Sequence, residues 1–180
     1  MNRLPKNLRM LAEEAASRHG LDADLVEAVT LVESGGDPDA WNPEPRYPYL
    51  WNVRKGMPFR RLTQEETLSK FPPKDFPCIG GDPDQEWWAQ QASWGLMQVM
   101  GAVARELKFR KPYLVTLCSN PGLNLDLGCA HLAGHLRWSA GDWERAVRAY
   151  NGGRGGVDLP MTESYLRKVR ACLETVRSGK

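Results

Sequence analysis

The sequence lacks the features of a membrane protein or of a nucleic-acid-binding protein. No apolar run in its 180 residues is long enough to span a bilayer, so we expect no stable insertion into a membrane. Lysine and arginine form no run, and a formal net charge of +2 is too weakly basic to indicate a nucleic-acid partner. The first twenty residues carry charged side chains where a signal peptide needs an apolar stretch. We therefore expect a chain that is made in the cytoplasm without a signal peptide.

Signatures of metal sites and disulfide frameworks are also missing. The four cysteines are scattered without a CxxC spacing, which argues against a zinc site or a dense disulfide framework. Cys129 and Cys172 fall on apolar helical stripes and are expected to be buried free thiols, although the disulfide state stays open, also for Cys78 and Cys118. His131 and His135 are four residues apart, as in zinc proteases, but the glutamate that follows the first histidine there is absent. We expect no metal and no cofactor.

Helical periodicity dominates outside one stretch that is rich in proline. Apolar spacing and capping residues predict helices over 4–19, 23–34, 86–91, 102–108, 124–138 and 143–150, and a last helix capped by Thr162. Between residues 37 and 85 prolines are frequent and little helical period survives, which is typical of a functional insertion or lid. A short hairpin is predicted there over Val53–Leu62. Without a repeat or a linker, the chain is expected to be a mainly α, monomeric single domain over residues 1–180.

One carboxylate continues an apolar helical stripe. Glu33 shares a helix face with Leu25, Val26 and Val29, and Gly35 two residues later ends the helix. Burial beside aliphatic groups and the negative end of the helix dipole both raise the pKa of such a carboxyl group. A protonated carboxylic acid near neutral pH is what a glycosidase needs to protonate its leaving oxygen. The plainer alternative is a helix-terminal glutamate whose side chain bends into solvent.

Short motifs at helix boundaries, taken in order, resemble those of soluble lytic transglycosylases, a family with a lysozyme-like fold that is related to goose-type lysozymes. The resemblance covers residues 21–41 and 92–170, and it leaves out a Pro-rich insertion over about 42–91, between the first and second motifs. The motifs are Glu33-Ser34-Gly35-Gly36-Asp37-Pro38, Gly95-Leu96-Met97-Gln98 and Ala149-Tyr150-Asn151-Gly152, with Glu163-Ser164-Tyr165-Leu166-Arg167-Lys168-Val169 similar to the family's final helix.

The resemblance implies a role for each matching residue. Glu33 matches the catalytic acid and base, and Ser34 a neighbour that holds local geometry or substrate. Met97 and Gln98 match a segment that lines the glycan groove. Tyr150 matches a residue whose hydroxyl group binds the catalytic carboxyl group, and Asn151 a groove residue near the substrate's acetamido group.

The resemblance further implies cleavage of the MurNAc-GlcNAc β-1,4 bond of peptidoglycan, with a single acid and a 1,6-anhydro-MurNAc product. Hydrolysis of the same bond, as in goose-type lysozymes, needs a second carboxylate, and Glu86, Glu44 and Asp37 are the candidates. A third alternative is a module that binds peptidoglycan or builds a virion without catalysis. The presence of Glu33, Gln98 and Tyr150 together argues against it.

Two expectations concern context. A lone catalytic domain without an export signal suggests a phage or prophage endolysin that reaches the cell wall through a holin or from a virion. The aromatic residues of the Pro-rich stretch and its end are expected either to extend the glycan groove or to form a satellite cluster under a long loop. They are Tyr47, Tyr49, Trp51, Trp87, Trp88 and Trp94.

Overall fold

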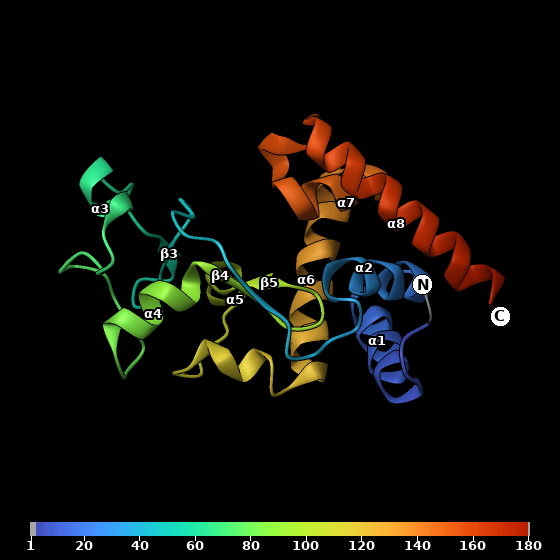
Figure 1. Ribbon diagram of the computed structural model, residues 1–180, viewed down its shortest axis with the longest axis horizontal. Coiled ribbons are helices and arrows are strands. Elements are labelled where there is room, and N and C mark those ends of the chain that lie inside the picture. The colour runs from blue at the N-terminus through green and yellow to red at the C-terminus, as the bar shows by residue number, and fades with distance from the viewer. Residues whose placement is uncertain (1–2, 180) are drawn as a thin grey trace.

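The computed structural model describes residues 3–179 and is mainly helical, which confirms the predicted fold class. Five helices pack on one another and are called the helical half from here on (Figure 1). The central α6 contacts α1 and α7, and α8 lies across α2 and α7. These helices are α1 (Lys6–His19), α2 (Ala23–Ser34), α6 (Pro121–Trp138), α7 (Trp143–Gly152) and α8 (Pro160–Ser178).

Local sequence explains where these helices begin and end. The carboxylate of Asp22 accepts the backbone N–H of Asp24 at the start of α2, and Asp142 caps α7 in the same way. Gly35 ends α2 in the left-handed conformation at φ 66°. The predicted cap of the last helix is wrong, because α8 starts at Pro160. Thr162 lies inside its first turn, where the hydroxyl group contacts preceding carbonyl groups.

The core of the helical half is apolar and closely packed around α6. The stripe of α2 is buried as the sequence predicts, with Val26 and Val29 fully inaccessible. Gly128 on α6 faces Met97, and a Cβ atom added at this glycine would lie 2.4 Å from the methionine sulfur. Only glycine therefore permits this contact between α6 and the turn that carries Met97.

A small antiparallel sheet in the order β1-β4-β5 adjoins the helical half. In its register Trp41 pairs with Trp94, and Asn42 pairs with Ser93. Because successive side chains of a strand point to opposite faces, the two tryptophans share one face, and Asn42 and Ser93 share the other. The strands are β1 (Trp41–Pro43), β4 (Ala92–Trp94) and β5 (Val99–Met100), followed by α5 (Gly101–Glu106).

Residues 42–91, called the Pro-rich segment below, carry short elements around a second, smaller core. Leu50, Phe76 and Trp87 form this core, so Trp87 belongs to a satellite cluster. A hairpin exists, but its strands begin earlier than predicted and lie at Trp51–Asn52 and Met57–Pro58. The elements are β2 (Trp51–Asn52), β3 (Met57–Pro58), α3 (Gln64–Leu68) and α4 (Pro83–Gln90), with 3-10 turns later in the chain at η1 (Leu114–Leu117) and η2 (Arg154–Gly156).

Two glutamines at the end of α4 hold the first part of the Pro-rich segment in place. The side chain of Gln90 accepts the backbone N–H of Trp51 and donates to the carbonyl group of the same residue. The side chain of Gln91 accepts the backbone N–H of Arg46. Both glutamines are buried, so these hydrogen bonds fix the path of the loop where apolar contacts are few.

Within residues 3–179, no helix combines the length and the apolar character that crossing a membrane would need. All four cysteines have free thiols, and those of Cys129 and Cys172 are buried.

Candidate active site

Glu33 lies in the last turn of α2, with its side chain half-buried beside α8. The hydroxyl group of Tyr165 donates a hydrogen bond of 2.5 Å to its Oε1 atom. Burial raises the pKa of Glu33 to about 7, while the hydrogen bond from Tyr165 opposes the shift and the charge of Glu44 adds to it. A substantial fraction of Glu33 is therefore protonated at neutral pH, as a general acid requires.

The phenol that contacts Glu33 is not the expected one. Tyr150 donates its hydroxyl hydrogen to the carbonyl oxygen of Met97 at 2.7 Å, so this single hydrogen is not available to Glu33. The hydrogen bond to Glu33 that the resemblance implies for Tyr150 is made by Tyr165 on α8. Tyr165 lies on the buried face of that helix, and a buried phenol normally finds a hydrogen-bond partner. That rule could have pointed to Tyr165 from sequence.

The turn between β4 and β5 also differs from the expectation. Met97 is completely buried with its side chain against Gly128, so this side chain is not open to a substrate, and lining of the glycan groove by the segment stays a prediction. The side-chain amide of Gln98 donates to the carbonyl groups of Ala40 and Gly95, and its oxygen accepts from Ser93. Its donors are thus used within the protein, and Gln98 fixes the turn in this structure.

Ser34 and Asn151 are the other two residues to which the resemblance assigns a role. The hydroxyl group of Ser34 contacts the carbonyl oxygen of Leu96 at 2.8 Å and thereby connects the end of α2 to the β4–β5 turn. It also accepts the backbone N–H of Gly36. Asn151 is exposed near the end of α7, next to Tyr150. Ser34 therefore positions the segment that carries Glu33, and contact of Asn151 with substrate stays a prediction.

The three candidates for a second carboxylate have different surroundings. Glu86 is buried in an ion pair with Arg105, whose Nη2 atom lies 2.6 Å from its Oε2 atom, so this carboxylate is structural and the prediction is wrong. Asp37 is exposed in a loop, where it accepts the backbone N–H of Asp39. Glu44 is exposed just after β1, and its charge acts on Glu33. Glu44 is the candidate that the structure places in the electrostatic field of the acid.

A cavity of about 760 Å³, called the histidine cavity here, lies along α6 and the α7–α8 loop, and neither Glu33 nor Tyr165 lines it. His131 and His135 on α6 line it together with Arg154, and the exposed Tyr49 contributes from the Pro-rich segment. The ring of His131 lies 5.2 Å from that of Tyr150, which places the cavity next to α7. Its lining therefore combines α6, the α7–α8 loop and the Pro-rich segment.

The two histidines of this cavity contact each other. Their Nε2 atoms are 3.2 Å apart, and burial lowers the pKa of His131 to about 3 and that of His135 to about 4. Both rings are therefore neutral at neutral pH. Within residues 3–179, no group of three or more histidine, cysteine or acidic side chains is arranged to hold a metal ion.

Comparison with known proteins gives a family. The model of the transglycosylase SLT domain matches residues 10–170, which is most of the chain. The chain belongs to the transglycosylase SLT domain family. No curated protein and no solved structure matches it. The SLT domain is a lytic transglycosylase, so this chain is a peptidoglycan-cleaving enzyme that acts on glycan strands. The match also spans the Pro-rich segment, so whether that segment is an insertion relative to the family stays a prediction.

Proposed function

We propose that this SLT domain cleaves the MurNAc-GlcNAc β-1,4 bond with Glu33 as its single acid and base and forms a 1,6-anhydro-MurNAc end. The observation that carries the proposal is the half-buried carboxyl group of Glu33, with a pKa near 7 and a phenol at hydrogen-bond distance. A group that titrates near the working pH can both give and accept a proton within one cycle.

The proposed reaction returns the proton to the protein. Glu33 donates its proton to the glycosidic oxygen, the bond from C1 of MurNAc breaks, and the GlcNAc part leaves with a free C4 hydroxyl group. The acetamido oxygen of the MurNAc residue stabilises the positive C1 centre. The Glu33 carboxylate then removes the proton of the C6 hydroxyl group while O6 bonds to C1. Tyr165 stabilises the carboxylate form between these two transfers, because its hydroxyl group donates to it.

A second candidate function is hydrolysis of the same bond. It is favoured by one observation: the charge of Glu44 lies close enough to Glu33 to raise its pKa. A carboxylate there would activate a water molecule in place of the C6 hydroxyl group, as a two-carboxylate glycosidase requires. Asp37 stays a weaker alternative in the exposed loop.

Mass spectrometry of the muropeptides released from purified cell walls separates the two reactions. We expect anhydro ends from the wild type and from the Glu44→Gln variant, and no release from Glu33→Gln. Reducing ends that disappear in Glu44→Gln would support hydrolysis. Cell walls left intact by folded wild type would contradict both reactions.

We further propose a role in phage lysis, with delivery by a holin or a virion, as the sequence predicts. Expression in a bacterial cytoplasm tests it: the culture should lyse when a holin is co-expressed and grow normally without one. Lysis without the holin would contradict the need for such a partner.

A further inference from the structure

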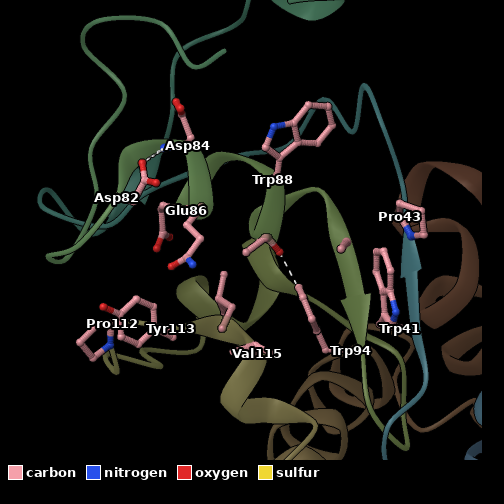
Figure 2. A pocket seen from close by; sticks show the side chains of 14 residues that line it. Trp41, Pro43, Asp82, Asp84, Glu86, Trp88, Trp94, Pro112, Tyr113 and Val115 are labelled. Atoms are coloured by element: carbon pink, nitrogen blue, oxygen red, sulfur yellow. Dashed lines mark hydrogen bonds between the residues drawn. The ribbon is translucent and has the colours of Figure 1, made fainter. Parts of the chain in front are cut away.

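The β1–β4 sheet has a cavity of about 670 Å³ on the face opposite to Asn42 and Ser93. It is lined by Trp41, Trp88, Trp94, Tyr113, Asp82 and Asp84 among others, and is called the tryptophan cavity here (Figure 2). The other face of the sheet carries Asn42, whose amide nitrogen donates to Glu44, the residue whose charge acts on Glu33. The tryptophan cavity is thus separated from the catalytic face by one layer of strands.

Large aromatic rings are left open to solvent at this cavity. Trp41 is 60% exposed, Trp88 44% and Tyr113 48%. Trp41 and Trp94 stack with centroids 6.2 Å apart and an interplanar angle of 22°, and the indole N–H of Trp94 donates to the carbonyl group of Ala89. Trp94 therefore anchors the stack, which is called the indole platform here. Exposed apolar surface of this kind normally marks a binding site.

The charged residues at the tryptophan cavity limit which class of ligand can bind there. Figure 2 shows Asp82, Asp84 and Glu86 gathered on one side of the cavity, with Trp41 and Trp94 on the other. Glu86 is neutralised by Arg105, and among the described residues the lining contains no lysine or arginine. An anionic ligand would meet uncompensated repulsion here. Carboxylates accept hydrogen bonds from hydroxyl groups, which favours a neutral ligand that carries them.

We propose that the tryptophan cavity is a second glycan-binding site, which takes an uncharged N-acetylglucosamine unit of the polymer. The apolar faces of sugar rings fit the indole platform, and hydroxyl groups reach the carboxylates of Asp82 and Asp84. A mostly apolar concave site with a few polar groups is typical of small-molecule recognition. The proposal rests on the proposed function in one respect: that function identifies the cell wall as the source of the glycan.

Binding of chitotetraose tests the site without any turnover. In the Glu33→Gln chain, isothermal titration should detect two binding events, and NMR should show shifts of the indole signals of Trp41 and Trp88. Trp88→Ala, added to Glu33→Gln, should weaken one event at least tenfold, and Trp88→Phe should restore most of it. The matched control is Phe71→Ala, which removes a 68%-exposed ring outside the cavity. A single event in the parent chain, or two unchanged events in a folded Trp88→Ala variant, would overturn the proposal.

A second measurement keeps this proposal separate from the catalytic one. In the wild-type background, Trp88→Ala should slow the clearing of insoluble cell walls several-fold and leave cleavage of short soluble glycans unchanged. If Trp88→Ala changed the rate on both substrates by the same factor, a role of the cavity in holding the polymer would be overturned. Failure of the wild type to cleave either substrate would contradict the proposed function, while the chitotetraose titration would still decide on the cavity. If the indole signals of Trp41 and Trp88 shifted when a peptide was added and not when chitotetraose was added, the proposal would also be overturned.

Discussion

The helical half and the Pro-rich segment contribute to the same site but are stabilised in different ways. The helical half buries an apolar core and supplies Glu33, Tyr165 and Tyr150. The Pro-rich segment has a core of few residues and depends on buried polar contacts such as Gln90 and the ion pair of Glu86. The comparison teaches that Glu33, the proposed acid, lies in the part of the fold with the larger apolar core, while Glu44 of the Pro-rich segment acts on it through its charge. The predictions below test that division, from the largest expected effect to the smallest.

Replacing the acid should have the largest effect. Glu33→Gln keeps the shape of the side chain but removes the transferable proton, so we expect cell-wall clearing, followed as loss of turbidity, to slow by about 10³-fold. Glu44→Gln in the Pro-rich segment is the matched control and should change the rate only a few-fold. An equal loss in both variants would place the chemistry in both regions and break the comparison.

Breaking the buried ion pair should destabilise the fold strongly. Arg105→Ala leaves the buried carboxylate of Glu86 without its partner, and we expect the free energy of unfolding to fall by about 3–5 kcal/mol in a denaturant titration. The control is Arg60→Ala, which removes exposed ion pairs to Glu66 and Asp75 and should cost far less. Similar losses of unfolding free energy in both variants would show that burial does not determine how much these ion pairs contribute to stability.

Stability should depend on pH through Glu33. Its pKa is about 7 in the folded chain and about 4.5 in the unfolded one, so the folded state binds the proton more tightly. This contribution is fully present below pH 4.5 and is lost as pH rises through 7, by up to about 3 kcal/mol. We therefore expect the stability of Glu33→Gln to increase relative to wild type between these pH values. If the stabilities of the two proteins changed in parallel over this pH range, the carboxylate of Glu33 would be solvated in the folded chain.

The smallest effect concerns the phenol. The hydrogen bond from Tyr165 favours the charged form of Glu33 and lowers its pKa, so Tyr165→Phe should move the alkaline limb of the pH-rate profile to higher pH. We expect the maximal rate to fall about tenfold, because a hydrogen bond to a charged group is lost. Tyr150→Phe is the comparison, since its hydroxyl group contacts Met97 and should leave the limb in place. The opposite pattern would restore the role that the sequence implied for Tyr150.

The sequence predicted much of the helical half because apolar spacing and capping residues act locally. Glu33 was found because it continues the stripe of Val26 and Val29. Contacts between distant segments were not predictable in this way. Glu86 lies shortly before the motif that begins at Gly95, but its partner Arg105 comes from another helix. Met97 is buried only because Gly128 lets α6 approach it.

Gly128 also limits how far the β4–β5 turn near Glu33 can lie from α6. A side chain at this position would push the β4–β5 turn away from α6 and carry with it the carbonyl oxygen that accepts from Tyr150 and the one that contacts Ser34. The missing side chain at this one position of α6 therefore sets the spacing between the β4–β5 turn and two residues near Glu33, Ser34 on α2 and Tyr150 on α7.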